Sequence, residues 1–184
     1  MSISLSPRRD AFLDELRREN ASPHTLRNYG IDLREFCEFF DGGMEPDLTG
    51  MRMWLSSLYE RGLAVPSIRR KLASVRTFYQ YLMREGAVLS NPAKLLSTPK
   101  MPKRLPNVPG AEQTNRLLDE VGEGKLDRPY PERDRAVFEV LYGCGLRVSE
   151  LSGLNLADVD RAERVLRIRG KGRKERLVPY GSKA

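Results

Sequence analysis

Apolar side chains recur every three or four residues through most of positions 10–86, the spacing that places them on one face of an α-helix. Four helices are predicted over this stretch; glycines at 42–43, 62 and 86 mark the ends of the last three. The second helix is expected to begin at Ser22-Pro23, a capping serine followed by a proline in the first turn. The predicted inward residues are Phe12, Leu13 and Leu16; Leu26, Tyr29, Leu33, Phe36, Cys37 and Phe40; Met51, Trp54, Leu55 and Leu58; and Ile68, Leu72, Val75, Tyr79 and Leu82. With a short fifth helix after Asn91-Pro92, the pattern predicts a helical domain over 1–97.

Residues 98–109, TPKMPKRLPNVP, contain four prolines and three basic side chains. Proline fixes the backbone and lacks an amide hydrogen, so this stretch is expected to be extended rather than helical. We therefore predict a linker here, between the domain over 1–97 and a second domain over 110–184. Its positive charge suggests that the linker lies along a negatively charged partner.

The second domain starts with helical spacing and ends with strand spacing. Three helices are expected, over 111–121, 131–143 and 148–154. Leu166 and Ile168 then alternate with arginines, a turn follows at Gly170-Lys171-Gly172, and a second strand is expected over 176–179. This pattern predicts a β-hairpin, with room for a third strand beside it. Because a hairpin behind a few helices does not complete a core, this domain is expected to be incomplete at Ala184.

The 184-residue chain has a formal net charge of +7, and its positive charge is gathered in two blocks. Residues 1–60 carry seven basic and eleven acidic side chains, whereas residues 61–104 carry ten basic side chains and one acid, Glu85. Residues 161–176 carry eight basic side chains and two acids. A solvated surface usually mixes the two signs, so blocks of one sign indicate a polyanionic partner. We interpret that partner as nucleic acid.

The sequence argues against several other classes of protein. No apolar run approaches the ~18 residues that span a bilayer, and the start, MSISLSPRRD, lacks the apolar core of a secretion signal. A cytoplasmic protein is therefore expected. Cys37 and Cys144 are far apart, which gives no support for a disulfide framework or a zinc site. With His24 as the single histidine, we expect neither a metal nor a cofactor.

Arg147 stands in an apolar run, between Leu146 and Val148 and shortly after two glycines. A guanidinium placed where a leucine would pack costs free energy unless a negative group meets it. From the residues alone, that group is either a carboxylate of the same protein or an anionic group of a bound partner.

The second domain contains GLRVSELSGLNLADVD at 145–160 and IRGKGRKERLVP at 168–179. The first domain and the linker contain SPHTLRNYGIDLREF, SIRRKLASVRTFYQYLMREG, NPA and PKMPKRLP. In this order the motifs resemble those of tyrosine recombinases, closest to the Xer type within the phage integrase family. The resemblance covers nearly all of the chain. It implies a mainly α fold: a SAM-like core-binding domain of four to five helices, then the N-terminal part of an α+β catalytic domain.

The resemblance implies site-specific DNA recombination, in which a tyrosine attacks a phosphodiester and forms a 3′-phosphotyrosyl link without ATP or metal. Arg147 matches the first of the family's two catalytic arginines and would hold the charged phosphate. Glu150, one helical turn later, would help to hold the site together; an ordinary surface ion pair is its alternative. Lys171 would protonate the leaving 5′-oxygen, with a simple phosphate contact as its alternative and Lys174 as its nearby competitor.

The chain departs from the family's pattern after the hairpin. The His-x-x-Arg pair with the second catalytic arginine, a later His or Trp, and the nucleophilic tyrosine normally follow the hairpin, and none of these catalytic elements follows it in this sequence. HTLR spells the His-x-x-Arg pattern, but it lies in the first domain, so His24 and Arg27 are interpreted as non-catalytic. Tyr180 is expected to pack rather than react. The 184-residue chain alone is therefore expected to bind DNA without cleaving it.

Duplex DNA is the expected partner, and the resemblance implies a parent protein that acts as a tetramer on DNA, formed by one recombinase or two. The predicted DNA-binding residues are Arg69, Arg70, Arg76, Lys100, Lys103, Arg104 and Arg173. The alternative function is that of a non-catalytic DNA-binding protein derived from a recombinase. A helical scaffold with no nucleic-acid role is disfavoured by the two basic blocks.

Overall fold

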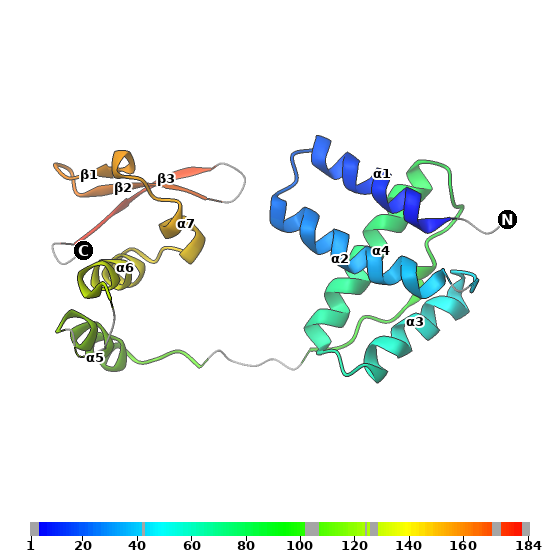
Figure 1. The fold of residues 1–184 in the computed structure, drawn as a ribbon, viewed down its shortest axis with the longest axis horizontal. Helices are drawn as coiled ribbons and strands as arrows, with labels where there is room; N and C mark the ends of the chain where they lie inside the picture. Colours follow the sequence, from blue (N-terminus) through cyan, green and yellow to red (C-terminus); the bar gives the residue numbers. More distant parts are fainter. Residues whose placement is uncertain are drawn as a thin grey trace. The chain divides into compact units, whose positions relative to one another are not determined.

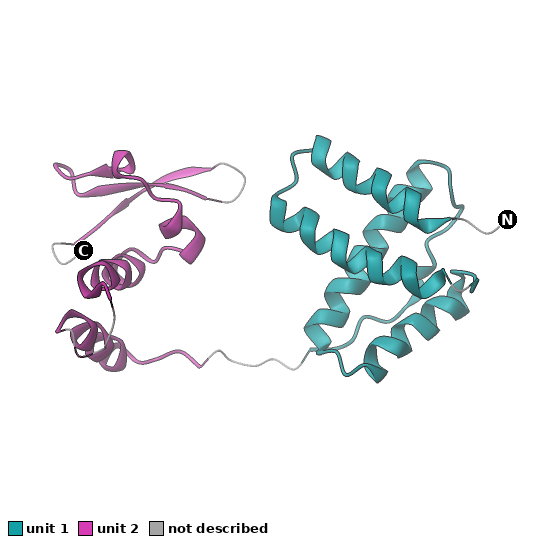
Figure 2. Cartoon of the chain, viewed as in Figure 1, with its two compact units in different colours: residues 1–104 teal, residues 105–184 magenta. Residues whose placement is uncertain are grey.

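The computed structural model of the 184-residue chain describes residues 4–41, 43–101, 107–123, 125, 129–170 and 174–181. The chain divides into two compact units, Met1–Arg104 and Leu105–Ala184, which are coloured separately in Figure 2. Within the described ranges, every helix is too short or too polar to pass through a bilayer.

The N-terminal unit is a bundle of helices, as the apolar spacing predicts (Figure 1). Its elements are α1 (Leu5–Arg18), α2 (Pro23–Phe40), α3 (Leu48–Glu60), α4 (Val65–Arg84) and a short 3₁₀ helix, η1 (Pro92–Leu95). Ser22 caps α2, because its hydroxyl accepts a hydrogen bond from the Thr25 amide at 3.1 Å. Asp47 caps α3 in the same way, accepting from the Gly50 amide at 2.7 Å. The predicted start of the second helix is confirmed, and the predicted fifth helix is the single 3₁₀ turn.

The core of this unit is formed by the inward faces of all four long helices. Trp54 of α3 packs edge-on against Phe36 of α2, with 5.1 Å between ring centroids. Phe12 of α1 lies against Phe78 of α4, with 5.7 Å between centroids. Every residue that the sequence pattern places inward is buried or half-buried. Burial of these aromatic and aliphatic side chains supplies most of the free energy that favours folding of the unit.

A charged cluster lies inside this unit, between α2 and α4. Asp32 is fully buried, and its carboxylate accepts hydrogen bonds from Ser74 Oγ at 2.9 Å, from Lys71 Nζ at 3.2 Å and from Arg70. Lys71 is buried too, and its Nζ pairs with a second carboxylate, that of Glu35, at 2.9 Å. Because the buried ions have partners of opposite charge, the cluster avoids the cost of an isolated ion in the core. It ties α2 to α4.

Arg76 of α4 holds η1 and the segment that follows it. Its Nε donates to the Ala93 carbonyl at 3.0 Å, and its Nη2 donates to the Leu96 carbonyl at 2.7 Å. Its Nη1 donates to the Thr98 hydroxyl at 2.8 Å. All three nitrogens of the guanidinium are thus engaged within the unit, which gives this predicted DNA-binding residue a structural role.

The C-terminal unit packs helices against a small antiparallel sheet (Figure 1). Its elements are α5 (Ala111–Gly122), α6 (Pro131–Cys144), α7 (Val148–Ser152), the 3₁₀ helix η2 (Leu156–Asp158), β1 (Val159–Asp160), β2 (Val165–Arg169) and β3 (Glu175–Pro179). The strand order is β1-β2-β3, so the predicted hairpin is confirmed and the third strand beside it is β1. Helix α7 ends at Ser152, two residues before its predicted end, because Gly153 terminates it.

The two faces of this sheet differ in burial. Leu166 and Ile168 of β2 point into the unit and are buried with Leu146, while Arg167 and Arg169 point outward. Partly buried side chains of α6, α7 and β3 complete this small core: Val140, Leu141, Cys144, Leu151 and Val178. Tyr180 packs against the same cluster, which agrees with its predicted packing role. The period-two pattern read in the sequence therefore gives the correct inner face.

Candidate active site

Arg147 lies at the junction between α6 and α7. Gly145 ends α6 in the left-handed conformation, with φ of 59°, a backbone geometry that glycine adopts without strain. The chain turns there, and Arg147 takes the extended capping position just before α7. Its side chain is 75% exposed. The expectation that Arg147 stands in apolar packing is therefore wrong: Leu146 is buried, but the turn directs Arg147 and Val148 toward solvent.

Glu150 binds Arg147 in two ways. Its Oε2 accepts a hydrogen bond from the main-chain amide of Arg147 at 2.9 Å, and its Oε1 accepts from Arg147 Nη1 at 3.0 Å. The first contact is the reciprocal half of a helix capping box, which fixes the start of α7. The contact predicted from the spacing of three residues is confirmed. The alternative of an ordinary surface pair does not fit Glu150, because its side chain is only 4% exposed.

Arg176 is the member of this site that the sequence analysis missed. Its Nη1 and Nη2 donate to Glu150 Oε1 and Oε2 at 2.8 and 2.9 Å, a bidentate ion pair. Arg176 lies on β3 opposite Ile168 of β2, on the inner face of the sheet. The sequence places Arg176 at an inward position, because residues two apart in a strand share a face and Val178 of the same strand is partly buried. A charged residue at an inward position is the signal that could have identified it.

Two guanidinium groups on one carboxylate set the electrostatics of the site. The hydrogen bond from Arg176 and the main-chain hydrogen bond from Arg147 lower the pKa of Glu150 to about 2, although its burial alone would raise that pKa. In return, Glu150 raises the pKa of Arg176. The three side chains carry a net charge of +1, so the cluster attracts an anion while its carboxylate stays ionised.

This pKa predicts a specific loss of stability in acid. The unfolded chain has Glu150 near its ordinary pKa of 4.5, and the folded chain has it near 2. The stabilising contribution of ionised Glu150 is therefore fully present above the unfolded pKa and is lost as the pH falls from about 4.5 to about 2. We expect the unfolding free-energy difference between the native chain and Glu150→Gln to shrink through this window. A difference that stays constant from about pH 5 to about pH 2, measured by urea unfolding, would contradict the expectation.

The predicted residues of the hairpin tip are only partly placed. Lys171 and Arg173 lie outside the described residues. At the root of the hairpin, the Gly170 amide donates to the Lys174 carbonyl at 2.7 Å, and Lys174 itself is exposed. A Cβ added to Gly170 would lie 3.5 Å from both Arg176 Nη1 and Glu150 Oε1, so the hairpin begins directly beside the ion pair.

The other predicted DNA-binding residues belong to the N-terminal unit and the linker. Arg69 is exposed and donates to the Pro99 carbonyl at 2.6 Å. Arg70 pairs with Asp32 but keeps 44% of its side chain exposed. Lys100 is exposed, whereas Lys103 and Arg104 lie outside the described residues. His24 and Arg27 are exposed on α2 and belong to the N-terminal unit, whereas the Arg147 site belongs to the C-terminal unit.

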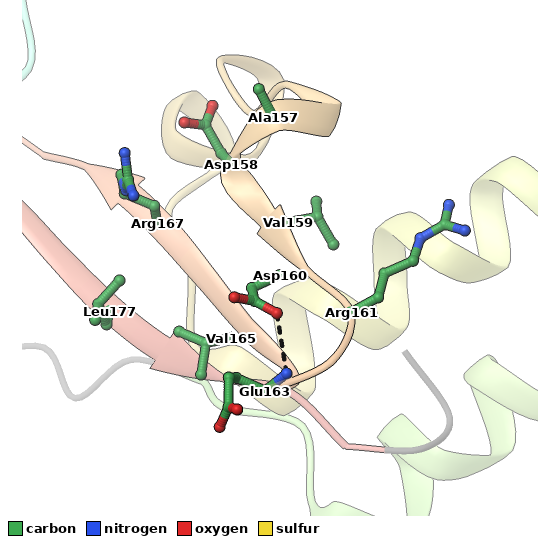
Figure 3. Close-up of a pocket in the computed structure, with 9 residues that line it drawn as sticks. All are labelled: Ala157, Asp158, Val159, Asp160, Arg161, Glu163, Val165, Arg167 and Leu177. Carbon is green, nitrogen blue, oxygen red and sulfur yellow. Dashed lines mark hydrogen bonds between the residues drawn. The ribbon is translucent and has the colours of Figure 1, made fainter.

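A separate pocket of about 730 Å³ lies at the outer face of the sheet (Figure 3). Val165 and Leu177 supply apolar surface, and Arg167 lies beside them. Asp160 accepts a hydrogen bond from the Glu163 amide at 2.9 Å, which stabilises the turn between β1 and β2. None of the predicted site residues that the structure describes lines this pocket, and Glu150 and Arg176 meet on the opposite, inner face of the sheet.

Two models of protein families match the chain. Residues 10–86 match the N-terminal SAM-like domain of phage integrase, and residues 110–184 match the phage integrase family. One match lies within each of the two units that the structure separates, and the second includes Arg147, Glu150 and Arg176.

Curated relatives are similar over almost the whole chain. Tyrosine recombinase XerC of Halalkalibacterium halodurans is 44% identical over 178 residues, which cover 94% of this chain and 58% of the relative. Tyrosine recombinase XerC of Myxococcus xanthus is 42% identical over 187 residues, which cover 98% of this chain and 61% of the relative. The chain thus spans 58–61% of the length of these relatives.

Solved structures share the fold at low identity. A lambda integrase dimer bound to a COC′ core site has a TM-score of 0.72 and 16% identity, covering 97% of this chain and 49% of that one. A lambda integrase tetramer bound to a Holliday junction has a TM-score of 0.73 and 16% identity, covering 97% of this chain and 51% of that one. At this identity the likeness establishes the fold alone.

Proposed function

The chain belongs to the phage integrase family, and we propose that it serves site-specific DNA recombination by a tyrosine recombinase mechanism. In this proposal the chain binds duplex DNA and contributes Arg147, Glu150 and Lys171 to an active site that cuts and rejoins strands through a 3′-phosphotyrosyl link. The observation that carries it is the solvent-exposed guanidinium of Arg147, fixed by Glu150 in a cluster of net positive charge.

The geometry suits a phosphate. Arg147 uses one terminal nitrogen for Glu150, and most of its side chain faces solvent. A guanidinium with free N–H groups forms paired hydrogen bonds to phosphate oxygens and stabilises the charge that grows on them during phosphoryl transfer. Glu150 acts as the support of Arg147, because it binds both its main chain and its side chain. Lys171 is proposed as the proton donor to the leaving 5′-oxygen.

The proposed partner is double-stranded DNA in the cytoplasm. The two lambda integrase structures are a dimer bound to a core site and a tetramer bound to a Holliday junction. By analogy, we propose that this chain's parent protein works as a tetramer on DNA, with copies of itself or with a second recombinase. The chemistry proposed for Arg147 and Lys171 uses side chains alone and calls for neither a metal nor a cofactor.

Replacing Arg147 with alanine tests the proposal directly. We expect Arg147→Ala to lower the affinity of the 184-residue chain for duplex DNA by about tenfold and to flatten the salt dependence of log affinity by about one unit, as loss of one phosphate contact does. Arg116→Ala is the matched control, since Arg116 is 82% exposed on α5 and pairs with Glu120. Equal effects of the two substitutions would contradict the role assigned to Arg147.

The alternative function is a non-catalytic DNA-binding protein, and the two basic blocks support it equally well. The functions differ at Arg147, because a protein that only binds DNA has no need of a guanidinium placed for a scissile phosphate.

A nicked suicide substrate adds a second test. We expect the 184-residue chain to bind it without forming a covalent protein–DNA adduct, because no His-x-x-Arg pair follows its hairpin and Tyr180, the tyrosine that does follow, packs against the core of the unit. An adduct on a denaturing gel would show that expectation to be wrong.

A further inference from the structure

Glu150 lies between two arginines that use it differently. Arg176 turns both terminal nitrogens onto the carboxylate, at 2.8 and 2.9 Å, in the bidentate geometry of a strong ion pair. Arg147 gives the carboxylate one terminal nitrogen, at 3.0 Å, and its side chain is 75% exposed, against 41% for Arg176. The carboxylate charge is therefore matched mainly by Arg176, and most of the charge of Arg147 is left uncompensated.

We propose that Arg176 is a positioning residue: by holding the Glu150 carboxylate, it keeps the guanidinium of Arg147 open to a DNA phosphate. The inference rests on the proposed function, which supplies the phosphate that Arg147 meets. Without Arg176, the buried carboxylate has Arg147 as its remaining cationic partner among the described residues. A buried carboxylate binds the nearest cation strongly, so Arg147 would turn to form a bidentate pair and lose the charge that attracts phosphate.

The position of Arg176 supports this role. Arg176 joins β3 to the start of α7, and a Cβ added to Gly170 at the root of the hairpin would lie 3.5 Å from its Nη1. Arg176 lies opposite Ile168, which is buried, so its backbone is held by the sheet rather than by a loop. A lysine at this position keeps the charge but cannot form the bidentate pair.

A set of variants of the 184-residue chain tests the proposal by its affinity for one DNA duplex over a salt series. Arg176→Ala is expected to lower the affinity about tenfold and to flatten the salt dependence by about one unit, as Arg147→Ala does. Adding Glu150→Gln to Arg176→Ala is expected to restore the affinity. The neutral amide still accepts the Arg147 main-chain hydrogen bond but no longer neutralises its guanidinium. A residue that only holds the fold together would not be rescued in this way.

The same changes in an Arg147→Ala background show whether the effect passes through Arg147. There, Arg176→Ala is expected to change the affinity by no more than about twofold, because coupled residues are not additive. Arg169→Ala is the matched control: it removes the same charge from β2, the strand beside β3, where Arg169 pairs with the buried Asp158 at 2.9 Å. We expect Arg169→Ala to act equally in both backgrounds. Arg176→Lys, which keeps the charge and the bulk, is expected to fall between the native chain and Arg176→Ala.

Two outcomes overturn the inference and differ from each other. Additive effects of Arg176→Ala and Arg147→Ala, or no rescue by Glu150→Gln in variants that unfold cooperatively, would show that Arg176 acts on DNA or on the fold by itself. No effect of Arg147→Ala on affinity or salt dependence would instead remove the proposed function, and this inference with it.

Discussion

Replacing Asp32 with alanine is expected to lower the free energy of unfolding of the N-terminal unit by about 3–5 kcal/mol, the usual cost of breaking a buried ion pair from one side. Asp32 is fully buried and holds Lys71, Ser74 and Arg70 of α4. Its removal takes three hydrogen bonds from the contact between α2 and α4. Lys71 keeps Glu35 at 2.9 Å, which places the expected loss toward the lower end of that range.

Urea unfolding followed by fluorescence measures this loss, because Trp54 is the single tryptophan and lies in the core of the same unit. Asp14→Ala is the control: Asp14 is 62% exposed and pairs with Arg17, so we expect a change below about 1 kcal/mol. The double variant Asp32→Leu/Lys71→Met is expected to recover most of the lost stability, since paired apolar replacements remove both charges together. A loss for Asp32→Ala no larger than that of Asp14→Ala would show that the cluster does not hold the helices.

The elements of the fold were predictable because each rests on a local pattern. The apolar spacing of the helices and the capping position of Ser22 each depend on residues within one or two turns. The hairpin was predictable because Leu166 and Ile168 alternate with arginines. In each case the free energy of burial and the geometry of the backbone favour the same structure. The element can therefore be predicted without knowing which other elements pack against it.

The charged contacts were predictable only where both partners are close in sequence. Glu150 follows Arg147 by three residues, and its contact was expected. Asp32 was missed although it shares the inward face of Tyr29 and Phe36, and Arg176 was missed although it shares the face of Val178. In both cases the ion-pair partner comes from a distant segment of the sequence, so only the tertiary structure shows which group of opposite charge it pairs with. An ionisable residue at an inward position is therefore the signal to search for a distant partner of opposite charge.

Arg147 shows a different limit. Its neighbours in sequence are apolar, and the local pattern therefore predicted apolar packing. The left-handed Gly145 and the start of α7 turn its side chain outward, and neither effect can be read from hydrophobic spacing. The structure thus removes the premise of a buried guanidinium but leaves Arg147 better suited to an external anion, because a solvent-exposed charge is available to DNA.

The affinity of the chain for duplex DNA is expected to fall by about 10³–10⁵ between about 50 and 200 mM salt, if the predicted cations neutralise the six to ten phosphates for which that range is typical. The predicted set includes seven DNA-binding side chains and Arg147. Arg76 is the member expected to contribute least to this slope, because its three guanidinium nitrogens already bind Ala93, Leu96 and Thr98. Fluorescence anisotropy over a salt series measures the slope directly.

Replacing the basic side chains of the linker distinguishes direct phosphate contacts from general electrostatic attraction to DNA. Replacing Lys100, Lys103 and Arg104 together with alanine is expected to flatten the slope by about 2–3 units, since each lost phosphate contact removes about 0.9. The matched control replaces Arg8, Arg17 and Arg18 of α1, which removes the same charge from residues 1–60, where eleven acidic side chains outnumber seven basic ones. If DNA lies along the linker, the control changes the slope by less than about one unit. Equal slopes in the two triple variants would mean that net charge alone attracts DNA, and the linker would lose its assigned place in the interface.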